Sequence, residues 1–251
     1  MVVAYDGRAY HGWQKQKSGT DTVQQQVEIA AVDVLKHPVV SKAASRTDSG
    51  VHAEGQVVCI ETDKQNIPLA GIRCAINSRL PFDIMVRSAR EVPVDFDPTR
   101  DAVGKTYRYT ICISPRVPVS LAGNTWRYGR PLDIEPMREA ARMLAGEHDF
   151  AGFASRGDDR ECTIRRIFAC DVIDWGIKME ILIRGNGFLY HMVRNIAGTL
   201  VEIGRGRWKP ERIREILVRG DRSLAGPTAP PEGLSLLCVH YNRDPCCNLL
   251  R

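Results

Sequence analysis

The spacing of apolar residues along the chain alternates between the periods of strands and helices. In the first half, strand patterns and helical patterns follow one another, which is typical of an α+β domain. The pattern predicts, in chain order, a strand over 1–5, a helix between Thr22 and Pro38, strands on either side of a polar turn at 43–56, a helix over 69–78, a strand over 83–90, a strand over 105–113, a helix from Asp133 to Gly146, a hairpin of 163–175 and 177–184, helices over 188–200 and 210–219, and a strand over 234–241.

A stretch with two prolines and no periodicity, residues 93–98, predicts a joint in the chain. We therefore expect two domains, an N-terminal α+β domain over 1–104 and a C-terminal α+β domain over 105–251.

Two elements of the second half place polar side chains on otherwise apolar patterns. In the strand over 105–113, Tyr107 and Tyr109 share the face of two isoleucines, and Tyr107 lies near one end, where it could meet a cleft. In the helix over 188–200, Arg194 lies beside the apolar stripe, so partial burial is expected. A partly buried arginine needs an anion nearby.

The polar turn between the first two paired strands carries the main candidate chemistry. Arg46 and Asp48 are two residues apart, so in an extended segment their side chains point the same way. A guanidinium holds a neighbouring carboxylate ionised, and an ionised carboxylate on a stiff loop can act as a nucleophile or a base. A solvated ion pair on a surface turn is the alternative, because such pairs are common and stabilise little.

Composition excludes several classes of protein. No run of about 18 apolar residues is present, so no membrane span is expected, and the first residues lack the design of a signal peptide. These features predict a soluble, cytoplasmic protein. The eight cysteines include no C-x-x-C pair, so we expect no zinc site, and the Cys246-Cys247 pair near the end has no evident role.

The charge is concentrated in the second half of the chain. Residues 1–104 carry 12 basic and 13 acidic groups, whereas residues 105–251 carry 23 basic and 17 acidic groups. Arginine outnumbers lysine 27 to 8. Arginine suits bidentate phosphate contacts and stacking on bases, so this composition favours a nucleic-acid partner, although it also fits the bias of a GC-rich genome.

Six sequence elements, in order along almost the whole chain, resemble those of the bacterial tRNA pseudouridine synthase A family within the pseudouridine synthase superfamily. They are Tyr5-Asp6-Gly7 with Tyr10 and Gly12-Trp13-Gln14, the signature Arg46-Thr47-Asp48-x-Gly50-Val51-His52-Ala53, Lys105-Thr106-Tyr107-Arg108-Tyr109, Glu147-His148-Asp149-Phe150 with Phe153, Phe188 with His191-Met192-Val193-Arg194-Asn195, and Glu232-Gly233-Leu234. The second element is highly specific.

The resemblance implies a role for each matching residue. Asp48 matches the catalytic aspartate of the family, and Arg194 matches the arginine that pairs with it. Tyr107 matches the tyrosine that stacks on the target uracil, and Leu234 matches an apolar residue that closes the pocket on the base. Arg46 matches a basic residue that helps to displace the base and hold RNA, and His52 of the same signature is expected to contribute to substrate binding.

The resemblance also implies a reaction, a partner and a fold. The family isomerises uridine to pseudouridine near positions 38 to 40 of the tRNA anticodon arm, as a homodimer, without a metal or nucleotide cofactor. Its fold is α+β, with two ferredoxin-like (RRM-like) halves whose sheets join into one curved mixed sheet and an active-site cleft between them. A non-catalytic RNA-binding protein, a hydrolase with a lone carboxylate, and a synthase that modifies other RNA positions are the alternatives.

Two departures from the family pattern flank the signature, and one of them is Glu54, which replaces a usual small or apolar residue. Ser45 stands where the family usually has glycine, and a serine in a left-handed backbone conformation would be strained. The turn is therefore expected to follow a somewhat different backbone path.

Overall fold

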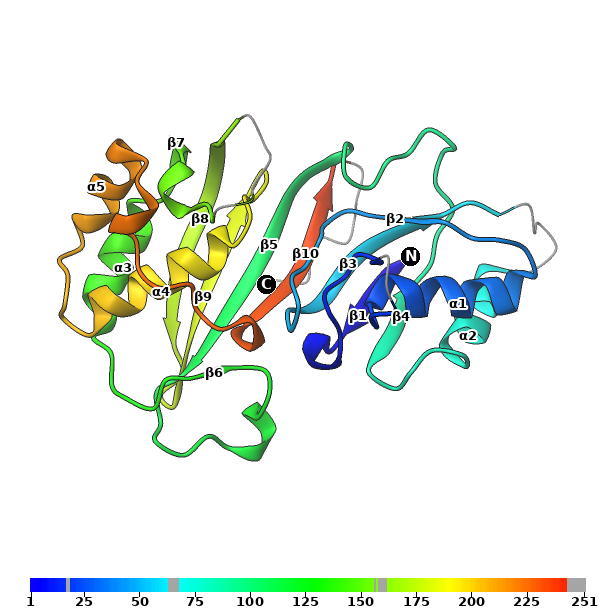
Figure 1. The fold of residues 1–251 in the computed structure, drawn as a ribbon, viewed down its shortest axis with the longest axis horizontal. Helices are drawn as coiled ribbons and strands as arrows, with labels where there is room; N and C mark the ends of the chain where they lie inside the picture. The colour runs from blue at the N-terminus through cyan, green and yellow to red at the C-terminus, as the bar shows by residue number, and fades with distance from the viewer. Residues whose placement is uncertain (17–18, 63–67, 156, 158–161, 243–251) are drawn as a thin grey trace. The chain divides into compact units, whose positions relative to one another are not determined.

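The structure, a computed structural model, describes residues 1–16, 19–62, 68–155, 157 and 162–242 (Figure 1). Cys246 and Cys247 lie outside the described residues. The described part contains ten strands and five α-helices, which confirms the predicted α+β class. None of its helices is long and apolar enough to cross a membrane. The chain divides into two compact units, Met1–Val103 with residues 235–242, and Gly104–Leu234.

The first unit is a sheet with two helices that pack against each other (Figure 1). Its elements are β1 (Val2–Tyr5), α1 (Val23–Leu35), β2 (Ser41–Ala43), β3 (His52–Ile60), α2 (Leu69–Asn77), β4 (Ile84–Ser88) and β10 (Leu234–Tyr241). Strand β1 lies between β4 and β3, and β2 pairs with β3. Taken in chain order, the first four strands therefore have the spatial order fourth, first, third, second, all antiparallel, which is the ferredoxin-like arrangement.

Strand β3 has different partners at its two ends. Its C-terminal end pairs with β2, where Ala43 faces Val58. Its N-terminal end pairs in parallel with β10, where Ser235 faces His52. Strand β3 begins directly after the polar turn. Its pairing with β10 therefore supports β3 at the end that is next to the turn.

The helices of the first unit begin where their sequences predict. The side chain of Thr22 accepts the backbone N–H of Gln25, so it caps α1 as expected. Val27 and Leu35 of this helix are fully buried. Helix α2 follows Pro68 and buries Ile72 and Ile76.

The second unit has a sheet in the order β5-β9-β8-β7, with β6 beside β5. Its elements are β5 (Ala102–Cys112), β6 (Trp126–Arg127), α3 (Ile134–Arg142), β7 (Gly146–Asp149), β8 (Ile164–Asp174), β9 (Lys178–Gly185), α4 (Met192–Gly204) and α5 (Arg212–Arg219). Helix α3 packs against both α4 and β8. The strand predicted over 105–113 and the predicted hairpin are β5 and the β8–β9 pair, so both are confirmed.

The predicted helix over 188–200 is wrong at both ends. Helix α4 begins at Met192 and continues to Gly204. His191 precedes it in a left-handed conformation (φ 59°), which no helical residue adopts. Residues 190–191 form a turn, closed by the backbone N–H of Met192, which donates to the carbonyl oxygen of Leu189 (3.1 Å). The apolar side chains of residues 188–191 fit a helical period, and the sequence pattern therefore extends the helix backwards.

The division of the chain differs from the sequence-based boundary at one element. Strand β10, which that boundary assigns to the C-terminal domain, pairs with β3 of the first unit. The joining of the two sheets and the cleft between the two halves stay predictions.

Candidate active-site loop

The loop between β2 and β3 carries Asp48 at a tight turn. The backbone N–H of Val51 donates to the carbonyl oxygen of Asp48 (3.1 Å), which closes the turn. Gly50 lies inside it with φ 79°, a conformation that glycine adopts without strain. Asp48 is partly buried, and the hydrogen bond of its own carbonyl oxygen holds its backbone in the turn.

The start of the loop is held by a buried glutamine. The Oε1 atom of Gln56 accepts the backbone N–H of Ser45 (3.1 Å), and its Nε2 atom donates to the carbonyl oxygen of Ser45 (2.6 Å). Gln56 is fully buried on β3. Ser45 does not have a positive φ, since Lys36 and His191 are the only non-glycine residues of the described part that do. Serine therefore fits this position without the strain considered above.

The middle of the loop, at Thr47, is held by residues of the N-terminal segment. The hydroxyl groups of Tyr5 and Thr47 form a buried hydrogen bond of 2.7 Å. The backbone N–H of Trp13 donates to the carbonyl oxygen of Thr47 (3.0 Å). At Gly12, which has φ 88°, a Cβ atom would lie 2.7 Å from that same oxygen, so only glycine allows this approach.

Tyr10 holds the far side of the turn. Its carbonyl oxygen accepts the backbone N–H of Gly50 (3.3 Å) and the hydroxyl of Ser49 (3.2 Å). Its own hydroxyl donates to Asp83 (2.7 Å), and burial together with that carboxylate raises the pKa of Tyr10. The sequence element over residues 5–14 thus forms the platform on which the Asp48 loop rests.

His52 lies inside the first unit, next to this platform. It is buried, and its Nδ1 atom lies 3.3 Å from both the backbone nitrogen of Gly7 and a carboxylate oxygen of Asp6. Burial acts to raise the pKa of Asp6, but hydrogen bonds from Arg8 outweigh it and the pKa lies below its ordinary value. These contacts favour a structural role for His52, and its part in substrate binding stays a prediction. Arg46, two residues before Asp48, is exposed.

In the second unit, Tyr107 lies on β5 opposite Ile183 of β9. It is buried, and its ring meets that of Phe188 edge to face, with centroids 5.1 Å apart and planes at 84°. Phe188 lies between β9 and α4, so the segment that was predicted as helix packs against this tyrosine.

Arg194 lies in the first turn of α4 and is partly buried, as predicted. Its Nε atom donates to the carbonyl oxygen of Ala229 (2.7 Å), and the backbone N–H of Ala229 donates back to the carbonyl oxygen of Arg194 (3.2 Å). Leu234 is buried at the start of β10, directly before the residue that pairs with His52.

The structure thus gathers Arg46, Asp48 and His52 in and beside one loop of the first unit, and places Tyr107 and Arg194 in the second unit. Physical reasoning from the sequence missed the residues that hold the loop, namely Tyr5, Tyr10, Gly12, Trp13 and Gln56. The family elements include the first four of these. Spacing alone does not reveal the contacts of these four residues with the loop, which span 30 or more residues.

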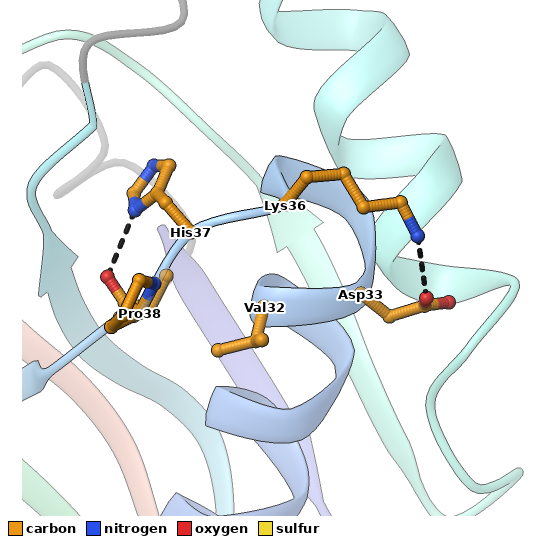
Figure 2. Close-up of a pocket in the computed structure, with 6 residues that line it drawn as sticks. Val32, Asp33, Lys36, His37 and Pro38 are labelled. Carbon is orange, nitrogen blue, oxygen red and sulfur yellow. Dashed lines mark hydrogen bonds and ion pairs between the residues drawn. The ribbon is translucent and has the colours of Figure 1, made fainter.

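A shallow hollow of about 650 Å³ lies elsewhere, at the C-terminal end of α1 (Figure 2). Its polar groups bond to nearby groups of the first unit, Lys36 to Asp33 (2.8 Å) and His37 to the carbonyl oxygen of Pro38 (2.8 Å). None of its lining residues is a predicted site residue, so we assign it no part in the chemistry. Over the residues that the structure describes, no group of three or more histidine, cysteine or acidic side chains is placed to hold a metal ion.

Comparison with known proteins gives the same family along most of the chain. A family model described as tRNA pseudouridine synthase matches residues 1–99 and 140–242. The chain is 44% identical over 241 residues to tRNA pseudouridine synthase A of Geobacter sulfurreducens, covering 96% of this chain and 98% of that protein. It is 43% identical over 243 residues to the protein of that name from Citrifermentans bemidjiense, covering 96% of each chain.

A solved structure titled "Crystal Structure of a Cbf5-Nop10-Gar1 Complex" is also similar, with a TM-score of 0.34 and 9% identity. The match covers 80% of this chain and 54% of that chain. A likeness at this level supports no statement about function.

Proposed function

Because the chain belongs to the tRNA pseudouridine synthase family, we propose that it modifies uridines of the anticodon stem-loop, near positions 38 to 40, with Asp48 as the catalytic residue. As a member of this family it is an isomerase that forms pseudouridine in tRNA. The observation that carries the proposal for Asp48 is its loop, which buried groups hold from both sides while the carboxylate stays partly exposed.

The reaction breaks the bond between ribose C1′ and uracil N1, turns the base, and joins C1′ to uracil C5. The hydrogen on C5 is lost and N1 gains one, so the product is an isomer of the substrate. Two routes are open to Asp48: it attacks the ribose or the uracil to form a covalent intermediate, or it removes a ribose proton to give a glycal. Both routes need a charged carboxylate in a fixed direction.

In this proposal Arg194 supplies the positive partner of Asp48. A guanidinium beside a carboxylate favours its charged form and orients it. The fixed geometry of Arg194 on Ala229 supports this role, because a partner that orients another group must itself be held.

The target base must leave its stack before it can react, which costs a few kcal/mol. Stacking on Tyr107, worth about 1–3 kcal/mol per base, would offset much of that cost. Leu234 would close the pocket on the base, and Arg46, which is exposed beside Asp48, would contact the RNA backbone and help to displace the base. His52 would act on the substrate only through the platform that it supports.

The test is to incubate the purified protein with unmodified tRNA transcripts and to map pseudouridine at each base. Wild-type protein should form it near positions 38 to 40, and Asp48→Ala should bind tRNA but form none. Asp95→Asn, which changes an exposed aspartate of the same unit, is the matched control and should keep full activity. Product from Asp48→Ala would overturn the role of Asp48, and product only at other positions would favour a synthase of different specificity.

A homodimer in the cytoplasm completes the proposal, with tRNA contacting both subunits. Sedimentation equilibrium of the purified protein checks the oligomeric state, because a dimer has twice the 28.1 kDa of the chain. A monomer that retains full activity would contradict this part of the proposal and leave the assignment of Asp48 intact.

A further inference from the structure

A short segment of the second unit, residues 225–230, lies directly on helix α4. The backbone N–H of Gly226 donates to the hydroxyl of Thr199 (2.9 Å), which in turn donates to the carbonyl oxygen of Asn195 (2.7 Å). At Gly198 a Cβ atom would overlap the carbonyl oxygen of Pro227. The segment and the helix thus touch backbone to backbone, and the side chain of Thr199 joins them.

The middle of the segment, at Thr228, is fixed by the amide of Asn195, which is fully buried. Its Oδ1 atom accepts from the hydroxyl of Thr228 (2.7 Å) and from the guanidinium of Arg222 (2.9 Å). Its Nδ2 atom donates to the carbonyl oxygen of Phe153 (2.7 Å). With donors and acceptors on opposite sides, the amide has one orientation only, and Thr228 is held in place.

The C-terminal end of the segment is fixed by the hydroxyl of Tyr109. This side chain is fully buried on β5, and its hydroxyl donates to the carbonyl oxygen of Pro230 (2.8 Å). Burial raises the pKa of Tyr109, so the hydroxyl remains a donor at any physiological pH. Pro230 and Thr228 are the two neighbours of Ala229.

Ala229, whose two neighbours are both anchored, forms two hydrogen bonds with Arg194. Its carbonyl oxygen accepts the Nε–H of Arg194 (2.7 Å), and its N–H donates to the backbone of the same arginine (3.2 Å). A guanidinium is rigid and planar, so a bond at Nε restrains the direction in which its two terminal nitrogens point. Ala229 is almost fully buried, and water cannot replace this bond.

We propose that residues 225–230, held by the hydroxyl of Tyr109 and the amide of Asn195, form a brace that sets the direction of the Arg194 guanidinium for pseudouridine formation. The inference rests on the proposed role of Arg194 in the reaction. Tyr109 and Asn195 are positioning residues: they act on the reaction through Arg194.

The chain offers a matched pair of substitutions to test the brace. Tyr109→Phe removes the hydroxyl that holds Pro230. Tyr241→Phe removes another buried hydroxyl, which donates to the carbonyl oxygen of Pro98 (2.7 Å) in the first unit. Both should lower the melting temperature to a similar extent. Only Tyr109→Phe should lower the single-turnover rate with saturating enzyme, by roughly tenfold or more, while the Kd for tRNA changes less than about twofold.

A second arm separates failure of the brace from failure of the proposed role of Arg194. Arg194→Lys keeps the charge but has no Nε–H for Ala229. Arg194→Met removes the charge, so a wild-type rate for Arg194→Met would show that the role of Arg194 is wrong. A wild-type rate for Arg194→Lys would show that the bond to Ala229, and with it the brace, is not needed. If Arg194→Lys is impaired but Tyr109→Phe and Tyr241→Phe have equal rates, the brace is wrong and the role of Arg194 stands.

A readout without activity completes the test. The Arg194 Nε–H resonance in ¹⁵N-arginine-labelled protein can be assigned by its loss in Arg194→Lys. The brace predicts that this signal shifts or broadens in Tyr109→Phe and is unchanged in Tyr241→Phe. An unchanged signal in Tyr109→Phe would overturn the proposal whatever the rates.

Discussion

Thr47 carries two of the bonds that hold the Asp48 loop, one through its hydroxyl and one through its carbonyl oxygen. The hydrogen bond between the hydroxyl groups of Thr47 and Tyr5 is buried, and it joins residues that are 42 positions apart in sequence. Such a bond stabilises the folded state by about 1 kcal/mol, but its larger effect here is geometric, because Thr47 is the neighbour of Asp48.

Thr47→Val replaces the hydroxyl by a methyl group of similar shape. We expect it to lower the free energy of unfolding by about 1–2 kcal/mol and to reduce the rate of pseudouridine formation more than tRNA binding. Urea denaturation and single-turnover kinetics measure the two effects. Thr47→Ser, which retains the hydroxyl, is the control, and a wild-type rate for Thr47→Val would show that the bond is not needed to place Asp48.

Cysteine reactivity provides a residue-scale check on the core of the second unit. Cys170 on β8 is buried, and burial raises the pKa of its thiol to about 12. Because the thiolate is the reactive form, Cys170 should resist iodoacetamide at neutral pH until the protein unfolds. Cys74 on α2 is exposed and should react in the native state. Mass spectrometry of the labelled peptides decides, and equal labelling of both would contradict this packing.

At the scale of elements, the sequence predicted the long regular segments well. The capping residues Thr22 and Asp133 begin α1 and α3 as expected, because a cap is a local interaction. The short strands β6 and β7 were missed. Strand β7 reads Gly-Glu-His-Asp and has no apolar alternation, so its pairing with β8 depends on a partner distant in sequence.

The candidate site shows the same limit. The sequence pattern indicates Arg46 and Asp48 as candidate site residues because they are only two positions apart. It indicates Arg194 because this residue lies beside the apolar stripe of α4. The contact of Tyr5 with Thr47 requires β1 to be paired with β3, and the contact of Gln56 with Ser45 requires β2 to be paired with β3. The family elements include Tyr5 and Thr47 but give no physical reason for their contact, and they do not include Gln56.

The loop that precedes β5 gives an element-scale prediction about pH. The carboxylate of Asp97 accepts the backbone N–H groups of Thr99 (2.9 Å) and Arg100 (3.0 Å), and these bonds hold the pKa of Asp97 below its ordinary value of 3.8. A lowered folded-state pKa contributes stability above the unfolded value, and that stability is lost as the pH falls through the folded value.

Asp97→Asn removes this titration. The fall in the free energy of unfolding between about pH 5 and about pH 3 should therefore be smaller in the variant than in wild type. Urea denaturation at each pH measures the difference. Equal slopes for the two proteins would show that these backbone bonds do not favour the charged form.

At the scale of the whole molecule, the first unit is discontinuous in sequence, since β10 comes from the end of the chain. Leu236 of β10 is fully buried and faces Ala53 of β3. We expect Leu236→Ala to lower the free energy of unfolding by about 2–5 kcal/mol, the usual cost of such a cavity.

Val218→Ala is the control for this substitution, because Val218 is 86% exposed on α5. It should change stability by less than about 0.5 kcal/mol. If Leu236→Ala were as mild as the control, β10 would not be an integral strand of the first unit.

The return of β10 to β3 also sets an order of events on the ribosome. The residues of the Asp48 loop are synthesised early, but the strand that supports the start of β3 emerges only after all of Gly104–Leu234 has been made. At about 5–20 residues per second this delay is on the order of 10 s. A nascent chain therefore carries its aspartate long before the unit around it can close, and a chain that terminates early is left without the support of its loop.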